Sequence, residues 1–467
     1  MARIASSSLF RGILMNVRFT QLLKKLASFE KRINKLPNFI IYGRLISVNG
    51  LVLEVIGLNI PIGSQCIIER TIDGKNFNIN AEVIGFSGTK TLLLSLEEIQ
   101  GVLPGAYVFL KTSSNMNYFI KKIPLGIELL GRVVDGRGRP LDGLPPLDDK
   151  CYTIKNYDNI NPLSRKPITK VLDTGIRAIN GLLTIGQGQR IGIFSSSGIG
   201  KSILLGMIAK YTEADVIVIA LIGERGREVK DFIENVLGEK GLVRSVIVAA
   251  PADVSPMIRI QAASYATSIA EYFCDKNKHV LLIMDSLTRY AMAQREVSLS
   301  LEELPVSKGY PSSIFSKIPN LIERVGNTKK GSITAFYTVL TEGEDGDDQD
   351  PVSYLARSIL DGHIILSRYY ADLGHYPAID IGSSISRVMP DIVDSEHYKQ
   401  SCYFKKLVSS YQKNRDLINV GAYIVGTDVI LDHAIKIWSN LERFLQQEVS
   451  EKSNYSTSCQ ELKKIFS

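Results

Sequence analysis

Hydrophobic and polar positions alternate over short distances in the first part of the chain. From residue 39 to residue 111, apolar runs of strand length follow one another closely, and Asn49-Gly50 separates two of them in the way that suits a tight hairpin turn. Short strands at this spacing are typical of a small β-barrel, which either binds oligonucleotides or holds an oligomer together. The expected strands cover residues 41–48, 51–56, 66–70, 81–86, 91–95 and 106–110.

A different rhythm follows from residue 166 to residue 390, where apolar strand patterns alternate with amphipathic helix patterns. This alternation predicts an α/β domain, in which a mainly parallel sheet carries helices on both faces. Two helices should begin at Pro256 and Pro351, since each proline follows a side chain able to cap a helix, Ser255 or Asp350. The expected strands cover residues 190–194, 216–222, 245–250, 280–284, 332–340 and 364–366.

Composition and periodicity divide the rest of the chain. Residues 112–165 are rich in Gly, Pro and Asp, which indicates a linker with one strand in it, and helical periodicity continues from about residue 391 to the end. Residues 1–38 place apolar side chains at helical spacing among basic ones, which predicts a basic amphipathic helix. The predicted parts are therefore an N-terminal segment (1–38), a β-barrel domain (39–111), a linker (112–165), an α/β domain (166–390) and a helical domain (391–467).

Composition narrows the class of protein. The 467 residues are 45% hydrophobic and 22% charged, which excludes wholesale disorder, a collagen-like repeat and a disulfide-stapled mini-protein. No apolar run approaches the roughly 18 residues of a membrane span. The five cysteines are scattered and lack CxxC spacing, so we expect neither a disulfide framework nor a zinc site, and a reducing cytoplasm is favoured.

The positive charge is concentrated at the N-terminus. The chain has 55 Lys and Arg against 48 Asp and Glu, a net charge of +7, and residues 1–38 account for the whole excess with eight basic residues and one acidic residue. The neutral remainder argues against a protein that coats nucleic acid. The basic helix is interpreted as a docking element for a partner or a membrane surface, as a cover for its own domain, or as a transit peptide. Residues 1–14 precede a second methionine, Met15, and are either a true extension or a misassigned start.

The chemistry centres on a phosphate-binding loop. It follows the predicted strand 190–194 and precedes a predicted helix over 202–211, which is the strand-loop-helix context of this motif. Its glycines let backbone N–H groups point at phosphates, Lys201 can reach the β- and γ-phosphates, and the Ser202 hydroxyl can coordinate Mg²⁺. Ser195 stands where the usual pattern has glycine or alanine, and an ordinary glycine-rich turn is the alternative interpretation. The loop comprises Ser195, Ser196, Ser197, Gly198, Ile199, Gly200, Lys201 and Ser202.

Two acids complete the requirements of a nucleotide hydrolase. Asp285 ends the apolar strand 280–284, where a carboxylate can hold Mg²⁺ or its water, and a helix-capping aspartate is the alternative. Glu224 follows the strand 216–222 and is the better candidate for the base that activates water, because adjacent strand ends of a parallel sheet converge on the ligand. Glu228 is the competitor, and spacing alone leaves the choice between them open.

Four segments carry a family resemblance: GERGRE at 223–228, MDSLTRYAMAQRE at 284–296, SITAFYTVL at 332–340 and GHYPAID at 374–380. Together they resemble the rotary-type hexameric ATPases, and more narrowly the type III protein export ATPases, the flagellar branch best. The segment YQKNRDLINVGAY at 411–423 is similar to the export family, and the acidic DELSEE-type segment of the ATP synthase β subunit is missing. The resemblance covers roughly residues 39–465.

The resemblance implies a RecA-like ATPase fold for the α/β domain and gives roles to the site residues. Lys201 and Ser202 would bind phosphate and Mg²⁺. Asp285 would be the Mg²⁺-associated acid, and Glu224 would polarise the attacking water in preference to Glu228. These roles agree with the chemistry expected from the residues themselves.

Two further residues gain a role only through the resemblance. Tyr376 would stack on the adenine of ATP. Arg387, which the pattern alone gives as an ordinary surface arginine, matches the arginine finger that reaches the γ-phosphate bound by the neighbouring subunit. Activity would then require a homohexameric ring, with the barrels as its collar.

The function that this resemblance implies is Mg²⁺-dependent ATP hydrolysis that energises type III protein export for flagellum assembly, through release, unfolding or delivery of export substrates to a membrane gate. The implied partners are a regulatory stator-like protein at the N-terminal segment, a central-stalk protein, export gate membrane proteins, and export chaperones and substrates. We expect a cytoplasmic location, peripheral at the inner face of the cell membrane.

Three alternatives remain: a virulence-type secretion ATPase, an ATP synthase catalytic subunit, and an RNA-translocating hexameric helicase. The neutral body of the chain and a barrel without an obvious aromatic stacking pair argue against binding of nucleic acid. An acidic loop, with six acids in the nine residues 342–350, is interpreted as a solvated connection between a strand and a helix.

Overall fold

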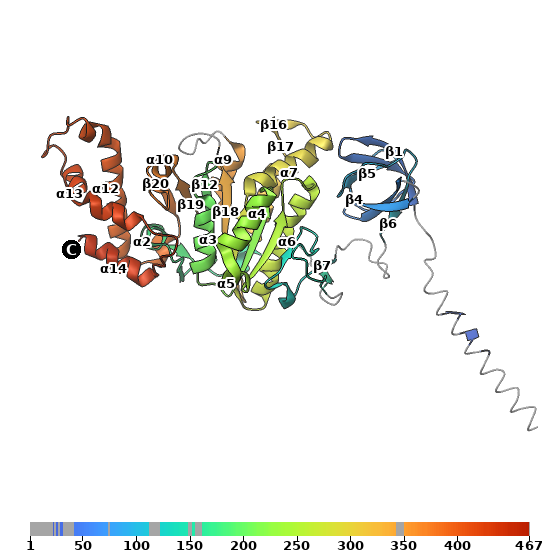
Figure 1. The fold of residues 1–467 in the computed structure, drawn as a ribbon, viewed down its shortest axis with the longest axis horizontal. Helices are drawn as coiled ribbons and strands as arrows, with labels where there is room; N and C mark the ends of the chain where they lie inside the picture. Colours follow the sequence, from blue (N-terminus) through green and yellow to red (C-terminus); the bar gives the residue numbers. More distant parts are fainter. Residues whose placement is uncertain are drawn as a thin grey trace, which may run out of the picture.

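Three parts follow one another in chain order along the long axis of the molecule (Figure 1). They are a β-barrel, an α/β domain and a group of helices at the C-terminal end. This computed structural model describes residues 22, 25–26, 29–30, 42–72, 75–111, 122–147, 152–154, 161–341 and 350–466. The predicted fold class is confirmed, because the central sheet carries helices on both faces between the barrel and the C-terminal helices.

The barrel closes in the strand order β1-β2-β5-β4-β3-β6. Its interior is apolar because alternate side chains of each strand point inwards, as with the buried Leu53 and Val55 of β2. The hairpin between β1 and β2 turns at Gly50, whose φ of +59° is in the left-handed region. All six predicted strands are confirmed: β1 (Tyr42–Asn49), β2 (Val52–Ile56), β3 (Gln65–Ile72), β4 (Lys75–Ser87), β5 (Lys90–Ser95) and β6 (Tyr107–Leu110).

The outer surface of the barrel carries an aromatic group that the sequence analysis missed. The ring of Tyr42 lies 5.4 Å from that of Tyr107 and 6.3 Å from that of Phe109, and the Arg44 guanidinium lies 4.6 Å from the Tyr107 ring centre. The Tyr107 and Phe109 rings are stacked, with centroids 6.0 Å apart, so the prediction of a barrel without an obvious aromatic stacking pair was wrong. Tyr42 precedes the other two rings by about 65 residues and meets them only because β1 pairs with β6, which places Tyr42 opposite Phe109.

The α/β domain is built on an eight-stranded sheet in the order β20-β19-β12-β18-β15-β13-β14-β8. All neighbouring strands are parallel except the antiparallel edge pair β19 and β20. The six strands predicted from continuous apolar runs are confirmed. They are β12 (Arg190–Ser195), β13 (Val216–Ile222), β14 (Ser245–Ala250), β15 (His279–Asp285), β18 (Ser332–Leu340) and β19 (Gly362–Leu366).

Two edge strands of this sheet were not predicted as part of it. β20 (Ile379–Ser386) has the mixed sequence IDIGSSIS, which lacks the apolar run of a central strand. β8 (Val133–Val134) has only two residues and lies in the predicted linker. That linker also contains β7 (Lys122–Pro124) and β9 (Tyr152–Ile154), so the expectation of one strand was wrong, and its buried Leu129 and Val134 belong to the core of the α/β domain.

Each face of the sheet buries its own apolar core. Val218 and Ala220 of β13 point to one face and Ile217 and Ile219 to the other, which is the period-two pattern of a doubly covered strand. The first face is covered by α6 (Pro256–Asp275), α7 (Leu287–Ser300), α8 (Ile314–Glu323) and α9 (Pro351–Ile359). The second is covered by α2 (Arg177–Leu182), α3 (Lys201–Tyr211) and the π-helix η4 (Phe232–Leu237).

The two predicted helix starts at Pro256 and Pro351 are confirmed, but only one of the predicted caps is present. The Asp350 side chain accepts a hydrogen bond of 2.9 Å from the Ser353 N–H and so caps α9. Ser255 caps nothing, because its hydroxyl donates to the main-chain oxygen of Ser95 in the barrel, 3.1 Å away. This residue therefore joins two domains.

The remaining elements are short. They are η1 (Ile127–Leu129), η3 (Pro162–Ser164), β10 (Val171–Leu172), β11 (Ile185–Gly186), α4 (Gly226–Asp231), α5 (Gly238–Leu242), β16 (Pro305–Ser307), β17 (Tyr310–Pro311), α10 (Arg368–Asp372) and α11 (Met389–Ile392).

The C-terminal part is helical, as expected, with α12 (Ser395–Asn419), α13 (Val429–Leu445) and α14 (Tyr455–Phe466). Phe404 of α12 is fully buried, and its ring contacts those of Phe444 and Phe466 at centroid distances of 5.4 and 6.5 Å. These residues share one core with the second face of the sheet, so the helices are fused to the α/β domain. No described helix is both long enough and apolar enough to cross a membrane.

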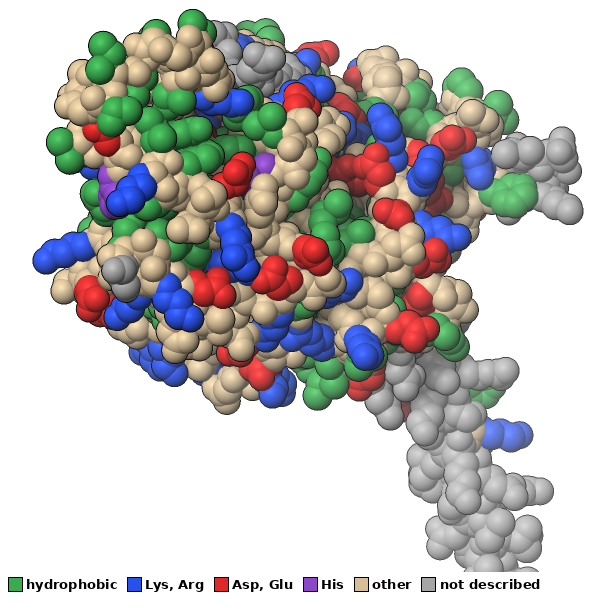
Figure 2. Space-filling model, turned by 60° about the vertical axis from the view of Figure 1, so that its left-hand side comes forward, with side chains coloured by type: hydrophobic (Ala, Val, Ile, Leu, Met, Phe, Trp, Pro, Cys, Tyr) green, Lys and Arg blue, Asp and Glu red, His purple; other side chains and the backbone are tan. Residues whose placement is uncertain are grey.

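Surface charge is mixed on the face that carries the helical part. Figure 2 shows acidic and basic side chains interspersed there, with hydrophobic side chains exposed towards its upper left. This view contains no extended surface of a single charge, in keeping with the neutral body of the chain.

Three expectations fall mainly on residues outside the described part of the chain. They are the amphipathic segment 1–38, of which only Leu22, Lys25, Leu26, Phe29 and Glu30 are described, all of them helical, the extension 1–14, and the acidic loop, of which 342–349 are outside.

The substitution Phe404→Ala tests the fusion of the helical part to the sheet. Removing this fully buried ring should lower the free energy of unfolding by about 3–5 kcal/mol, because the core on both sides loses contacts. Urea unfolding can be followed through Trp438, the single tryptophan, which stacks on Tyr411 in the same part. Leu417→Ala, at an exposed position of the same helix, is the control, and an equal effect of the two would contradict the fusion.

Candidate active site

The predicted phosphate-binding loop lies between the central strand β12 and the helix α3. Gly198 and Gly200 have φ values of +84° and +85°, a conformation that glycine adopts without strain. Gly200 is the N-cap of α3 and offers no side-chain cap, so the first N–H groups of the helix lack partners within it. A helix N-terminus of this kind favours an anion, which supports the prediction of a phosphate-binding loop over that of an ordinary turn.

The other loop residues differ in exposure. Ser195 is buried at the end of β12, and its carbonyl accepts a hydrogen bond of 3.0 Å from the Thr341 N–H. Its hydroxyl has no hydrogen-bond partner within the described part of the chain. The small serine is thus accommodated at this departure from the usual pattern. Ile199 is buried, Ser196 is partly buried, and Ser197, Gly198 and Ser202 are exposed.

Lys201, Glu224 and Asp285 meet beside this loop. The Lys201 Nζ lies 2.5 Å from Asp285 Oδ1 and 3.5 Å from Glu224 Oε1. All three side chains are at most 12% exposed. They converge because α3 follows β12, while Glu224 and Asp285 lie at the carboxyl ends of the adjacent strands β13 and β15.

The close charges shift two protonation equilibria. Burial, together with repulsion from Asp285, raises the pKa of Glu224 to about 7. Burial alone would lower the pKa of Lys201, but attraction to Asp285 and Glu224 outweighs it, so this pKa lies above its ordinary value. Lys201 is therefore a permanent cation, while Glu224 can gain or lose a proton near neutral pH.

Asp285 is held as part of this site. Its Oδ1 accepts a hydrogen bond of 2.7 Å from the Thr338 hydroxyl of β18. The alternative of a capping aspartate is wrong, because the N-cap of α7 is Ser286, whose side chain accepts from the Arg289 N–H.

The structure also distinguishes the two candidate glutamates, although their side chains are in hydrogen-bond contact. Glu224 faces Lys201, whereas Glu228 is exposed and pairs with Arg225 at 3.7 Å. Position therefore favours Glu224 as the residue that acts on a bound nucleotide.

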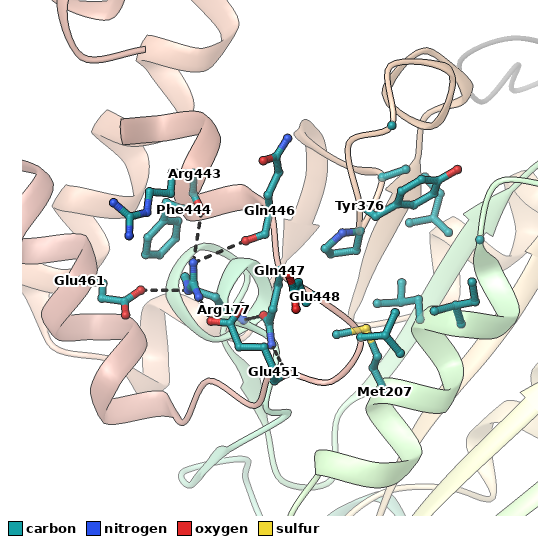
Figure 3. A pocket seen from close by; sticks show the side chains of 18 of the residues that line it. Arg177, Met207, Tyr376, Arg443, Phe444, Gln446, Gln447, Glu448, Glu451 and Glu461 are labelled. Atoms are coloured by element: carbon teal, nitrogen blue, oxygen red, sulfur yellow. Dashed lines mark hydrogen bonds and ion pairs between the residues drawn. The ribbon is translucent and has the colours of Figure 1, made fainter. Parts of the chain in front are cut away.

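Tyr376 lies on the other side of the loop, in the wall of a large pocket (Figure 3). A Cβ built on Gly200 would lie 3.3 Å from the Tyr376 ring, so ring and loop are in close approach. The pocket has a volume of about 1140 Å³, and its lining includes Ile199 and Gly200 of the loop and Phe444 and Gln446 of the helical part. The half-exposed Tyr376 ring and the apolar wall suit a flat base.

The sequence analysis missed the residues that join the α/β domain to the helical part at this pocket. Gln447 is buried, its N–H donates to the Tyr376 carbonyl at 3.0 Å, and its side chain accepts from the Arg177 N–H at 2.7 Å. Arg177 donates to the carbonyls of Arg443 and Gln446 at the end of α13, as Figure 3 shows, and pairs with Glu451 and Glu461. No local pattern marks these residues, since their partners lie about 270 residues away.

Arg387 does not join the other site residues within one chain. It follows β20, whose last residue Ser386 pairs with Gly362 at the amino end of the parallel strands. The loop lies at the carboxyl end of these strands, and the length of β12 alone places about 13 Å between the two ends. Arg387 is exposed, so it can face another molecule.

The donors around Lys201 suit a hard divalent cation bound together with phosphate. Asp285 offers a carboxylate, Glu224 Oε1 is buried and accepts no hydrogen bond from the described residues, and the Ser202 hydroxyl is exposed at the start of α3. Mg²⁺ is usually held by one or two protein oxygens plus phosphate oxygens and water. The residues therefore fit the predicted ATP and Mg²⁺. In the described residues no three His, Cys, Asp or Glu side chains form a site that could hold a metal by protein ligands alone.

Two family models match the α/β domain and the helical part. Residues 175–386 match the ATP synthase alpha/beta family, nucleotide-binding domain, and residues 393–464 match the T3SS EscN ATPase C-terminal domain. The first match contains the loop and both acids. The second covers the helical part.

Whole-chain relatives agree with these matches. The chain is 77% identical to the flagellum-specific ATP synthase of Buchnera aphidicola subsp. Acyrthosiphon pisum, over all of both chains. It is 56% identical to the flagellum-specific ATP synthase of Salmonella typhimurium, over 97% of this chain and 99% of that one.

A solved structure gives the same relation in three dimensions. The assembled ATPase EscN from the type III secretion system of enteropathogenic E. coli superposes with a TM-score of 0.83 at 41% identity, over 91% of this chain and all of EscN. A second structure, EscN with its central stalk EscO, superposes with a TM-score of 0.81 at 40% identity over the same shares.

The raised pKa of Glu224 predicts a pH dependence of stability. In the folded chain this pKa is about 7, above the ordinary value of 4.5, so the folded chain binds the proton more tightly. The resulting stability is complete below about pH 4.5 and is lost as the pH rises through 7. Relative to Glu224→Gln, the native chain should therefore lose roughly 1–3 kcal/mol of stability between pH 5 and pH 8.

Urea unfolding without nucleotide at both pH values measures this difference. The exposed Glu239→Gln in α5 is the matched control, and its stability relative to the native chain should not change with pH. A difference between Glu224→Gln and the native chain that is the same at both pH values would contradict the prediction.

Proposed function

Since the chain belongs to the flagellum-specific ATP synthases of the ATP synthase alpha/beta family, we propose that it hydrolyses ATP to energise type III protein export in flagellum assembly. The energy would serve release, unfolding or delivery of export substrates to the membrane gate. The observation that carries this proposal is the meeting of Lys201, Glu224 and Asp285 beside an uncapped helix N-terminus.

The residues of the loop hold the nucleotide. The free N–H groups at the start of α3 and the Lys201 ammonium bind the phosphates of ATP, and Ser202 and Asp285 hold Mg²⁺. When bound, Mg²⁺ neutralises charge on the phosphates. Tyr376 stacks on the adenine at the mouth of the pocket.

Glu224 prepares the attacking water. Its carboxylate accepts a hydrogen bond from the water and directs the oxygen lone pair at the γ-phosphorus. A pKa near 7 makes Glu224 a stronger base than an ordinary carboxylate, so it can take a proton from the water as the bond forms. Lys201 stabilises the negative charge that develops on the phosphate oxygens.

Arg387 completes the site of the neighbouring subunit. Its place at the opposite edge of the sheet supports this role, because it cannot reach the loop of its own chain. Each subunit would then depend on the next, which requires a ring, and we propose a homohexamer with the barrels as its collar. EscN, the similar solved structure, is an assembled ATPase.

The proposed partners follow the same reasoning. A central-stalk protein is proposed because EscN forms a complex with its central stalk EscO. A regulatory stator-like protein at the N-terminal segment, the gate membrane proteins, and export chaperones and substrates complete the set. The proposed place is the cytoplasm, at the inner face of the cell membrane.

Glu224→Gln should separate binding from hydrolysis. The amide keeps the size of the side chain but cannot take a proton, so ATP affinity should stay within a fewfold while kcat falls by about 10²-fold or more. Equilibrium binding of a fluorescent ATP analogue and phosphate release measure the two quantities. Glu228→Gln should keep full activity, and a Glu224→Gln protein with near-native turnover would remove Glu224 from the mechanism.

Mixing two inactive variants tests the shared site. Lys201→Ala lacks the phosphate ligand and Arg387→Ala lacks the finger, so each alone should be inactive. In a 1:1 ring, about a quarter of the sites combine an intact Lys201 with an intact Arg387 from the neighbour, and about that share of activity should return. Each variant mixed with itself is the control. A mixture without activity would contradict a finger supplied in trans.

A further inference from the structure

Arg387 is anchored on one short segment of its own chain. Its main-chain N–H donates to the carbonyl of Asp361 at 3.0 Å, and its Nη2 donates to the carbonyl of Arg357 at 2.9 Å. Arg357 lies in the last turn of α9, and Asp361 lies between α9 and β19. Both the backbone and the side chain of Arg387 thus depend on where this turn lies.

Asp361 is in turn gripped by Arg190, the first residue of β12. Its Oδ2 accepts from the Arg190 N–H and Nε, both at 3.0 Å, and its Oδ1 accepts from Arg190 Nη2 at 3.1 Å. The Asp361 N–H donates back to the Arg190 carbonyl at 2.9 Å. Two planar groups joined by parallel hydrogen bonds have little freedom to turn, so the Asp361 main chain is fixed relative to β12.

The ion pair is shielded and durable. The Arg190 and Asp361 side chains are 14% and 23% exposed. Burial alone would lower the pKa of Arg190, but Asp361 and Glu323 raise it above its ordinary value. Glu323 binds the outer side of the same guanidinium, with Oε1 2.6 Å from Nη1. Its ion pairs within the described residues are with Arg190 and Arg165 and not with Arg387, which makes it a suitable control position.

Gln189 ties the same turn to β20 from inside the molecule. It is fully buried, and its Nε2 donates to the carbonyl of Asp361 at 3.1 Å and to the hydroxyl of Ser386 at 3.0 Å. The Ser386 hydroxyl donates onwards to the carbonyl of Thr184 at 2.8 Å. Ser386 directly precedes Arg387. The Gln189 amide therefore fixes both the end of β20 and the Asp361 carbonyl, which accepts from the Arg387 N–H.

We propose that Asp361, held by Arg190 and Gln189, is a positioning residue that aims Arg387 at the active site of the neighbouring subunit. The inference rests on the proposed role of Arg387 as a group supplied in trans. One strand, β12, then begins at the anchor of the finger and ends at the phosphate-binding loop. Each subunit carries these two half-sites at opposite ends of the same buried strand.

A positioning role of Asp361 and a purely structural role differ in which task of the subunit the substitution impairs. A merely structural ion pair would support both tasks of a subunit, which are to bind ATP at its own loop and to supply Arg387 to its neighbour. The positioning role concerns the second task alone. A subunit without the Asp361 side chain should therefore still hydrolyse ATP when an intact neighbour supplies the finger.

The test begins with Asp361→Ala alone. Its kcat should fall on the order of 10–100-fold, because a catalytic group displaced by about 1 Å loses this much, while KM for ATP should change by less than about threefold. Glu323→Gln removes the outer partner of Arg190 and should keep near-native kcat. Ser386→Ala, which leaves the ion pair intact, is the second variant and should lower kcat about 3–10-fold, and it carries the test if Asp361→Ala fails to fold.

Directional mixing then decides between the two roles. Mixed 1:1 with Lys201→Ala, the Asp361→Ala subunits should regain about a quarter of native activity, because Lys201→Ala subunits supply a well-placed Arg387. Mixed with Arg387→Ala, they should regain nothing, because neither subunit supplies one. Recovery with Arg387→Ala, recovery with neither partner, or a native kcat of Asp361→Ala alone would overturn the inference.

The mixture of Lys201→Ala with Arg387→Ala distinguishes this failure from failure of the proposed function. If that mixture is active, any of the contrary results above removes only the role of Asp361. If that mixture is inactive, Arg387 does not act in trans, and the inference falls with the proposal on which it rests.

Discussion

The site depends on the ion pairs of Lys201 with Glu224 and Asp285. Glu224 and Asp285 are buried side by side at the ends of β13 and β15, and two carboxylates so placed would repel each other strongly without a cation between them. Burial and the repulsion from Asp285 both raise the pKa of Glu224, and the Lys201 ammonium offsets them only in part, so this pKa is about 7. The strand order of the sheet, which places β13 beside β15, therefore also contributes to the basicity of Glu224, the residue proposed to act on water.

Most of the sheet and the loop could be predicted from the sequence because their signals are local. Continuous apolar runs mark strands that are buried on both faces, such as Val216–Ile222, and a glycine-rich turn before Lys201 marks the loop. Features made by distant pairing were missed: the aromatic group of Tyr42 and Phe109, the contact of Ser255 with the barrel in place of a helix cap, and the addition of the short strand β8 to the main sheet. In each case the partner that decides the structure lies far away in the chain.

The same division holds within the site. Asp285 and Glu224 were found because strand ends converge in any open parallel sheet. The roles of Arg177 and Gln447 in forming the pocket were not predicted. They depend on the segment after α13, which folds back towards the loop and closes the pocket beside Tyr376. The helical part contributes one wall of the pocket, so an adenine base held against Tyr376 would contact two regions that lie far apart in the sequence. A local sequence pattern cannot predict such a wall.

The position of Arg387 on an exposed edge has a consequence for counting. If Arg387 acts in trans as proposed, a subunit on its own carries a loop without a finger and a finger without a loop, and each contact between neighbours completes one site. An open arc of subunits therefore has one complete site fewer than it has subunits, and only closure makes the two numbers equal. The number of complete sites would thus depend on whether the ring is closed as well as on the number of subunits. The last subunit to join would complete two sites at once.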